Sequence, residues 1–204
     1  MELVVKCGLI AINPTAFNMA EKKLNTVRIN AGEWRSRLLK FPDAQGLRPT
    51  PERVRQTVFN WLGQDLTGKK CLDLFAGTGV MGFEALSRNA QSVVLVEKAT
   101  AVYKAMLDNK STLKADAAQV LNMDALAFLD KNQALFDLVF VDPPYHQGWL
   151  DKVLAQLPKH LNPHGVVYVE AEYALADDET WQVFKQSKAG NVFYHLIKLR
   201  HDTN

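Results

Sequence analysis

The chain has 204 residues, of which 48% are hydrophobic and 23% charged, and a formal net charge of +2 at neutral pH. This length allows one full-sized core with a small appendage, because domains usually have about 100 to 200 residues. The composition argues against a disordered, collagen-like or membrane-embedded chain. Two cysteines, Cys7 and Cys71, make no disulfide framework, so we expect a reducing, cytoplasmic setting.

The start of the chain contains an apolar stretch, residues 3–12, which Lys6 interrupts. It lacks the basic segment and the small-residue cleavage site of a signal peptide, which we therefore do not expect. It is also far shorter than the roughly 20 apolar residues of a membrane span. We expect residues 1–20 to be a flexible extension, and a start at Met19 is an equally plain explanation of this stretch.

Positive charge is concentrated in the first part of the chain. Residues 1–60 hold ten Lys and Arg against five Asp and Glu, which leaves 14 against 17 for the rest. A basic segment of this kind suits a surface that follows the phosphate backbone of a nucleic acid. A solvated basic face is the alternative, and charge alone favours it.

A small basic hairpin is predicted from two short strand-like runs, residues 27–30 and 34–39. A helix is expected over residues 50–62, with Thr50 as the N-cap, and Gly63 should end it. Both elements precede the main domain.

From residue 70 onward, short apolar runs alternate with amphipathic segments of helical length, as in a doubly wound α/β sheet. Strands are expected over residues 71–75, 92–96, 119–122, 138–141 and 166–169, and helices over residues 81–87, 100–113, 125–131 and 149–161. Residues 181–185 and 192–199 have no helix between them and predict a C-terminal antiparallel hairpin. The sheet should be seven-stranded and mostly parallel. The predicted organisation is a flexible extension, a basic hairpin with a helix, and a main domain, over residues 1–20, 21–66 and 67–204.

A glycine-rich loop, Asp73-Leu74-Phe75-Ala76-Gly77-Thr78-Gly79, lies between a predicted strand and a predicted helix. With Gly82 it has the G-x-G-x-x-G spacing, which lets a ligand approach the backbone. A dinucleotide would place its pyrophosphate there, whereas the acid at Asp73 favours a cationic amino group. S-adenosylmethionine carries an ammonium and a sulfonium, so we predict it as the cofactor. The predicted contacts from this loop are Asp73, Phe75, Gly77, Thr78 and Gly79.

Two further strand ends provide candidate cofactor contacts. Glu97 can accept hydrogen bonds from two ribose hydroxyls, a placement that a NAD site shares. Asp124 can accept the adenine amino group while Met123 or Ala125 packs on the ring, and Lys98 is included in the predicted site. The alternative for Glu97 and Asp124 is an exposed strand end or a helix N-cap.

The tetrad Asp142-Pro143-Pro144-Tyr145 follows a predicted strand, at the sheet edge that holds the glycine loop. Its prolines are rigid and leave carbonyl groups free to accept hydrogen bonds. Asp142 and the Pro143 carbonyl can then orient a substrate amino group, while Tyr145 stacks on a flipped base. The predicted chemistry is methyl transfer to an amino nitrogen, driven by positioning and electrostatics. A rigid surface turn is the alternative.

Histidines offer little further chemistry in this sequence. His146 adjoins the tetrad and could touch a substrate phosphate, whereas His160, His164, His195 and His201 are interpreted as loop or surface residues. No cluster has metal-ligand spacing, so no metal site is predicted.

The chain resembles the RsmD-like methyltransferases, which modify a guanine N2 in small-subunit (16S) ribosomal RNA. The resemblance covers about residues 26–200. It rests on two family-specific stretches and on two motifs that many amino methyltransferases share, at residues 28–37, 48–62, 73–79 and 142–145. It implies a class I (Rossmann-like) methyltransferase fold with an N-terminal RNA-binding hairpin. The implied partner is 16S ribosomal RNA, within an assembling or assembled small subunit.

Charge and resemblance together predict which basic residues contact RNA phosphates: Arg28, Arg35, Arg37 and Arg53. We expect a monomer that does not associate with membranes. A DNA adenine-N6 methyltransferase shares the tetrad chemistry but usually needs a larger target-recognition region. A non-catalytic RNA-binding module could retain the fold, although the complete motifs argue against it. A protein-amide methyltransferase leaves the hairpin unexplained, and a NAD oxidoreductase leaves the tetrad unexplained.

Overall fold

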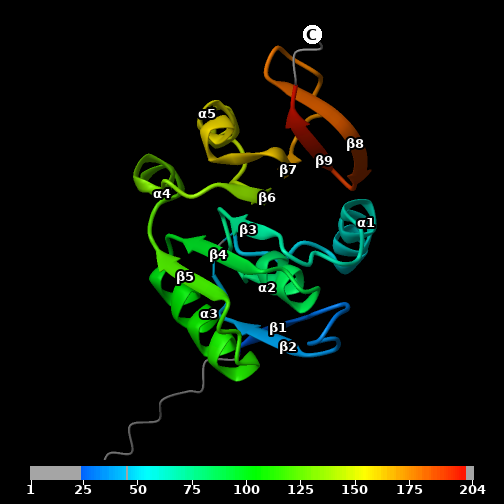
Figure 1. The fold of residues 1–204 in the computed structure, drawn as a ribbon. Coiled ribbons are helices and arrows are strands. Elements are labelled where there is room, and N and C mark those ends of the chain that lie inside the picture. Colours follow the sequence, from blue (N-terminus) through cyan, green and yellow to red (C-terminus); the bar gives the residue numbers. More distant parts are fainter. Residues whose placement is uncertain (1–23, 45, 201–204) are drawn as a thin grey trace, which may run out of the picture.

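The computed structural model describes residues 24–44 and 46–200, so the expected flexible extension, with Cys7, lies outside the described residues. The elements in chain order are β1 (Asn25–Arg28), β2 (Leu38–Phe41), α1 (Glu52–Leu62), β3 (Lys70–Asp73), α2 (Val80–Ser87), β4 (Ser92–Glu97), α3 (Thr100–Leu113), β5 (Ala118–Asn122), α4 (Ala125–Lys131), β6 (Phe136–Val141), α5 (Trp149–Gln156), the 3-10 helix η1 (Leu157–His160), β7 (Leu161–Ala171), β8 (Trp181–Ala189) and β9 (Val192–Leu199) (Figure 1). Across these described residues, no helix is long and apolar enough to span a membrane.

Seven strands form one sheet in the order β5-β4-β3-β6-β7-β9-β8, while β1 and β2 form a separate pair. Strands β5, β4, β3, β6 and β7 are parallel to one another. Strand β9 runs antiparallel to both β7 and β8. The strand order reverses between β3 and β6, which is where open α/β sheets bind ligands. The predicted doubly wound, mostly parallel sheet with a C-terminal antiparallel hairpin is therefore confirmed.

Helices cover both faces of the sheet, and alternate strand residues contribute to two cores. Cys71 and Leu138 face the core that contains residues of α1, α2 and α3. Their neighbours Leu72 and Val139 face the core that contains residues of α4 and α5. Figure 1 shows these two helical layers on opposite sides of the strands. Because both faces are covered, the parallel strands are continuously apolar in sequence.

The N-terminal hairpin has a wider connection than the sequence predicts. Its strands are antiparallel and pair from Asn25 with Phe41 to Arg28 with Leu38. The second strand therefore begins at Leu38 rather than at Trp34, and residues 29–37 form a loop. The prediction of a strand over residues 34–39 is wrong for its first four positions.

The shape of this loop is set by side chains of α2. The Glu84 carboxylate, fully buried, accepts hydrogen bonds from the backbone N–H groups of Asn30 at 2.7 Å and Ala31 at 3.0 Å. Arg88 pairs with the same carboxylate at 2.8 Å. The Ser87 hydroxyl donates to the Ala31 carbonyl at 2.6 Å. Because charged acceptors make strong hydrogen bonds, these contacts override the local strand preference.

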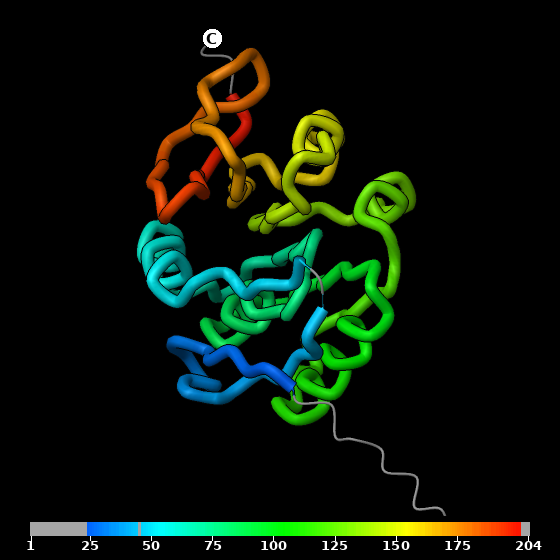
Figure 2. The backbone as a smooth tube through the Cα atoms, turned by 180° about the vertical axis from the view of Figure 1, so that it is seen from behind, coloured from blue at the N-terminus to red at the C-terminus, as the bar shows by residue number. Residues whose placement is uncertain are grey.

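The hairpin is also fixed to α3. The Asn109 side chain accepts the backbone N–H of Lys40 at 2.9 Å and donates to the carbonyl of Lys40 at 2.8 Å. It thereby replaces a missing strand partner at the edge of β2. Figures 1 and 2 both show the hairpin (blue) lying against α3 (green).

Helix α1 begins differently from the prediction. Its N-cap position is Pro51, and no side chain caps the helix. Thr50 is buried, and its hydroxyl acts on the carboxyl group of Glu170 on β7, whose pKa it lowers. The predicted N-cap role of Thr50 is wrong, because the N-cap position lies one residue later, at a proline without a capping side chain. Gly63 ends the helix as predicted, with a φ of 81°.

Two elements in the C-terminal half differ in length from the prediction. The helix predicted over residues 149–161 ends as α5 at Gln156 and continues as η1. Pro158 lies within η1 and has no N–H group with which to extend an α-helix. Strand β8 continues to Ala189, beyond the predicted end at Lys185, and pairs with β9 as expected.

We expect a Gly32→Ala substitution to destabilise the protein by about 3 kcal/mol or more. Gly32 has a φ of +81°, and an added Cβ would lie 1.7 Å from the backbone oxygen of Ser87. The matched control is Gly63→Ala, since Gly63 has the same φ and no heavy atom within 4 Å of the Cβ position. The control should lose only about 1 kcal/mol. Urea unfolding measures both, and equal losses would contradict a close contact at Ser87.

Candidate functional site

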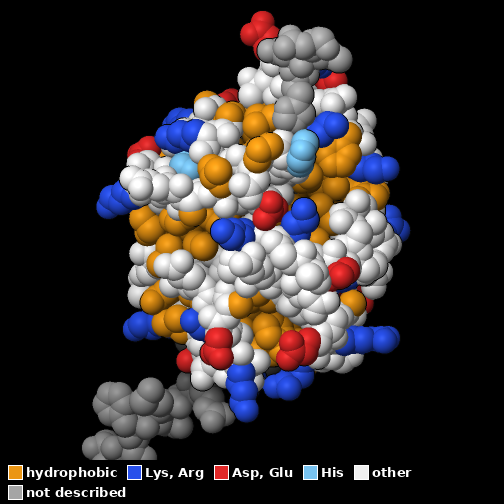
Figure 3. Space-filling model, viewed as in Figure 1, with side chains coloured by type: hydrophobic (Ala, Val, Ile, Leu, Met, Phe, Trp, Pro, Cys, Tyr) orange, Lys and Arg blue, Asp and Glu red, His pale blue; other side chains and the backbone are white. Residues whose placement is uncertain are grey.

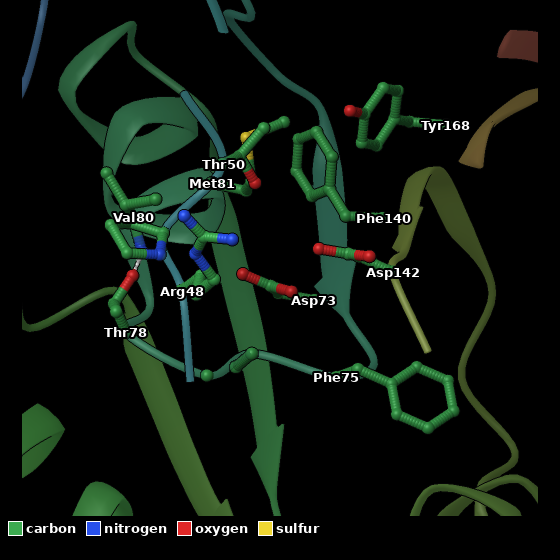
Figure 4. Close-up of a pocket in the computed structure, with 13 residues that line it drawn as sticks. Arg48, Thr50, Asp73, Phe75, Thr78, Val80, Met81, Phe140, Asp142 and Tyr168 are labelled. Carbon is green, nitrogen blue, oxygen red and sulfur yellow. Dashed lines mark hydrogen bonds between the residues drawn. The ribbon is translucent and has the colours of Figure 1, made fainter. Parts of the chain in front are cut away.

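A pocket lies at the carboxyl ends of β3 and β6, where the strand order reverses (Figure 4). The predicted site residues that line it are Asp73, Phe75, Gly77, Thr78 and Asp142. Figure 4 shows the carboxyl groups of Asp73 and Asp142 directed toward the same space, while the Phe75 ring points away from them. The structure therefore brings the glycine loop and Asp142 of the tetrad together in one pocket.

The glycine loop has the backbone conformation that its sequence requires. Gly77 and Gly79 have φ values of +50° and +75°, and the second is the N-cap of α2. The Glu97 carboxylate accepts the N–H of Gly77 at 2.9 Å and that of Ala99 at 2.6 Å. Glu97 therefore joins the loop to the end of β4. A carboxylate has about four lone-pair positions, so it can still accept hydrogen bonds from a ligand.

Asp73 is a buried carboxyl group with one backbone partner. Its Oδ2 accepts the N–H of Gly82 at 3.1 Å, and the side chain is 4% exposed. Burial raises the pKa of Asp73 to about 7, and the nearby Glu97 adds to this effect. Within the part of the chain that the structure describes, none of the ion pairs involves Asp73. A buried acid of this kind can hold a cationic ligand group.

The remaining predicted cofactor residues lie at the end of β5 and after β4. Asp124 is the N-cap of α4, where its Oδ1 accepts the N–H of Leu126 at 3.0 Å. Its other oxygen lies 3.3 Å from the ammonium nitrogen of Lys98, whose side chain is 75% exposed. Ala125 is buried in the second core. The N-cap role considered from the sequence is thus present, and a contact with adenine stays a prediction.

The tetrad follows β6, and its acid and its aromatic ring differ in exposure to solvent. Asp142 lies against the pocket, and burial raises its pKa well above the ordinary value, with Glu170 and Asp73 adding to this effect. Tyr145 is 37% exposed. His146, whose side chain is 86% exposed, lies with its Nε2 2.8 Å from a carboxylate oxygen of Glu172. The tetrad thus offers a partly buried acid next to an exposed ring.

Sequence reasoning missed four residues near Asp142. Arg48 and Thr50 line the pocket from the segment before α1, and Tyr168 lines it from β7. Glu170, also on β7, is 5% exposed and accepts a hydrogen bond from the Tyr168 hydroxyl at 2.6 Å. One signal could have indicated Glu170. It directly follows a predicted strand, as Asp142 does.

The predicted RNA-contacting arginines are all exposed on the hairpin, its loop and α1: Arg28, Arg35, Arg37 and Arg53. None of them lines the pocket. Arg55 is 1% exposed and instead donates to the carbonyl oxygen of Arg28 at 2.7 Å and to the side-chain oxygen of Asn30 at 2.9 Å. Figure 3 shows one face of the molecule, on which Lys and Arg side chains are spread among acidic and apolar ones. The basic residues on this face therefore do not form a single positively charged patch.

Two histidine interpretations are wrong. His160 and His195 are 2% and 0% exposed, and the His195 ring accepts the N–H of Leu175 at 3.1 Å. His201 lies outside the described residues. Over residues 24–44 and 46–200, no group of three or more His, Cys, Asp or Glu side chains could hold a metal ion.

A family model described as "Conserved hypothetical protein 95" matches residues 27–198. The chain belongs to this family. Ribosomal RNA small subunit methyltransferase D of Escherichia coli K12, a relative of known name, is 41% identical over 177 residues, which cover 84% of this chain and 89% of the relative. The protein of that name from Haemophilus influenzae is 42% identical over 180 residues, with 84% and 93% covered. These matches confirm the resemblance to RsmD-like proteins.

Solved structures support the same fold. The Escherichia coli protein yhhF is 39% identical, with a TM-score of 0.78 over 86% of this chain and 98% of that one. The Thermus thermophilus 16S rRNA N2 G1207 methyltransferase, solved in complex with AdoMet and guanosine, is 20% identical. Its TM-score is 0.67 over 87% of this chain and 50% of that chain, which shows a shared fold.

Proposed function

We propose that the protein transfers a methyl group from S-adenosylmethionine to the exocyclic N2 of a guanine in 16S ribosomal RNA. The observation that carries this proposal is that Asp73 and Asp142 share one pocket at the carboxyl ends of β3 and β6. The related proteins named ribosomal RNA small subunit methyltransferase D support RNA as the methyl acceptor. We further propose a monomer that acts in the cytoplasm on an assembling or assembled small subunit.

The pocket fits the cofactor because it offers a buried acid to a ligand with positive charge. Asp73 would hold the ammonium group, and the loop from Gly77 to Gly79 would let the ligand approach the backbone. Glu97 would bind the ribose hydroxyls. The other proposed contacts to the cofactor are Phe75, Thr78, Lys98, Asp124 and Ala125. The bound cofactor supplies an electrophilic methyl group.

The tetrad would orient the substrate base. Asp142 and the carbonyl oxygen of Pro143 would accept hydrogen bonds from the amino group, which fixes the direction of the nitrogen lone pair. Pro144 keeps the turn rigid, and the exposed ring of Tyr145 would stack on the flipped base. His146 would contact a phosphate.

The N-terminal segment would bind RNA. Arg28, Arg35, Arg37 and Arg53 are exposed, as phosphate contacts require. In this proposal residues 21–66 serve RNA binding, and residues 67–204 serve cofactor binding and catalysis.

Identifying the labelled nucleoside tests the function directly. The purified protein is incubated with radiolabelled S-adenosylmethionine and, separately, with naked ribosomal RNA, partly assembled small subunits and duplex DNA. We expect label in N2-methylguanosine from RNA or subunits. Label only in N6-methyladenine from DNA would overturn the substrate, and no label in any reaction would overturn the activity.

Asp142→Ala should lower the single-turnover rate of methyl transfer by about 100-fold or more, because an acceptor for the substrate amino group is lost. Cofactor affinity should change by less than about threefold, since Asp73 and the glycine loop remain. Rapid-quench kinetics and isothermal titration calorimetry measure the two effects. A variant with normal turnover would remove Asp142 from the mechanism.

Cofactor affinity should increase with pH through the pKa of Asp73, which is about 7. Below that pH the carboxyl group is largely neutral and attracts the ammonium group weakly, whereas above it the carboxylate is charged. We expect affinity to rise about tenfold from about pH 6 to about pH 8 and to level off above that. Calorimetric titrations across this range measure it.

The matched variants for this titration are Asp73→Asn and Asp137→Asn. The first should bind weakly with little pH dependence. The second changes a carboxylate at the other end of β6, where it accepts the N–H of Lys70 at 2.8 Å, and should keep the wild-type dependence. A steep pH dependence that persists in Asp73→Asn would assign it to another group.

A further inference from the structure

A second acidic side chain, that of Glu170, lies beside Asp142 on the neighbouring strand. Val141 of β6 pairs with Val169 of β7, so Asp142 and Glu170 are the next residues along two parallel strands. Glu170 is 5% exposed. After burial, its charge has the largest effect in raising the pKa of Asp142. The tetrad chemistry described above does not use Glu170.

Hydroxyl groups surround the Glu170 carboxyl group. The Tyr168 hydroxyl donates to its Oε1 at 2.6 Å, and the hydroxyls of Thr50 and Tyr145 also act to lower its pKa. Burial raises the pKa of Glu170, and the three hydroxyl donors offset part of this effect because they favour the charged form. None of the ion pairs formed by the described residues involves Glu170. No described cation therefore lies in ion-pair contact with this carboxyl group.

The other titratable and charged groups near this pair come from several elements. Asp73 on β3 also raises the pKa of Asp142, and Tyr194 on β9 pairs with Glu170 across the strands. Arg48 and Tyr168 line the same pocket, and Tyr145 follows Asp142 in the tetrad. Among these charged groups, Glu170 has the largest effect on the pKa of Asp142.

We propose that Glu170 is a positioning residue for methyl transfer, whose negative charge strengthens Asp142 as the acceptor of the proton that the substrate amino group releases. This inference rests on the proposed function. The amino nitrogen forms a bond to the methyl carbon while the carbon–sulfur bond breaks, and sulfur keeps the electron pair of that bond. The nitrogen then carries a positive charge and gives one proton to the Asp142 carboxylate, which becomes a neutral carboxyl group and later passes the proton to water.

The pH dependence of the single-turnover rate tests this role. The rate should fall at low pH as Asp142 becomes protonated and unable to accept. A carboxyl group next to a negative charge ionises only at a higher pH. Removing that charge in Glu170→Gln should therefore move the acid limb of the pH–rate profile, which is the fall in rate at low pH, to lower pH. We expect a displacement of about one pH unit, with a plateau rate about threefold to tenfold lower because Asp142 is a weaker acceptor. The KM for RNA should stay the same.

Glu172→Gln is the matched control, because it removes a carboxylate two residues along the chain that contacts His146 and does not act on Asp142. Its acid limb should coincide with that of the wild type. Thr50→Val, which removes one hydroxyl donor from Glu170, should move the limb in the same direction as Glu170→Gln but by less. This second variant keeps the test valid if Glu170→Gln does not fold.

Three outcomes distinguish the possibilities. An acid limb displaced in both Glu170→Gln and Thr50→Val supports the proposed role of Glu170. Lower rates with an unmoved acid limb would contradict this role and indicate that Glu170 only stabilises the structure. Wild-type protein that methylates no RNA would overturn the proposed function instead. In that case a carbon-13 NMR titration of the Asp142 carboxyl group, in wild-type protein and Glu170→Gln, still measures the interaction, and identical titrations would overturn the inference.

Discussion

The Glu84 carboxylate makes the contacts on which the arrangement of the N-terminal segment depends. It is fully buried and joins three parts of the chain, since it binds two backbone N–H groups of the loop after β1 and the guanidinium of Arg88. A buried carboxylate of this kind is stable only while all these partners are present, and loss of one partner of a buried pair costs about 3 to 5 kcal/mol. Helix α2 thus carries the glycine loop at its first residues and the hairpin at its last turn. The glycine loop and the basic hairpin are thus attached to opposite ends of one helix.

A second constraint is the concentration of acids at one edge of the sheet. Asp73 and Glu170 are buried, Asp142 is partly buried near them, and burial raises the pKa of each. Such a group of carboxyls is costly without positive charge nearby. A cationic cofactor, as proposed above, would relieve this cost. The hydroxyls around Glu170 reduce the cost further without neutralising it.

Local patterns allowed much of the fold and of the candidate site to be predicted. Helices α3 and α4 begin and end where the sequence places them, and the glycine loop and the tetrad lie at the predicted sheet edge. The loop at residues 29–37 could not be predicted because its shape depends on Glu84, more than fifty residues away in the chain. Thr50 was misassigned for the same kind of reason, since its hydroxyl acts on a carboxyl group of β7. Buried polar side chains find partners that sequence periodicity does not reveal.

The attachment of β2 to α3 has a consequence for how the chain folds during synthesis. A two-stranded hairpin is marginal in water by itself, and the apolar side chains of this one, Val27, Ile29, Leu39 and Phe41, belong to the core completed by α1, α2 and α3. Because synthesis proceeds from the N-terminus, the hairpin emerges long before Asn109, which holds Lys40 in the folded protein. The first described element to be synthesised is therefore among the later ones to be stabilised. Until α3 has been synthesised, these four apolar side chains of the nascent hairpin lack the core residues that they contact in the folded protein.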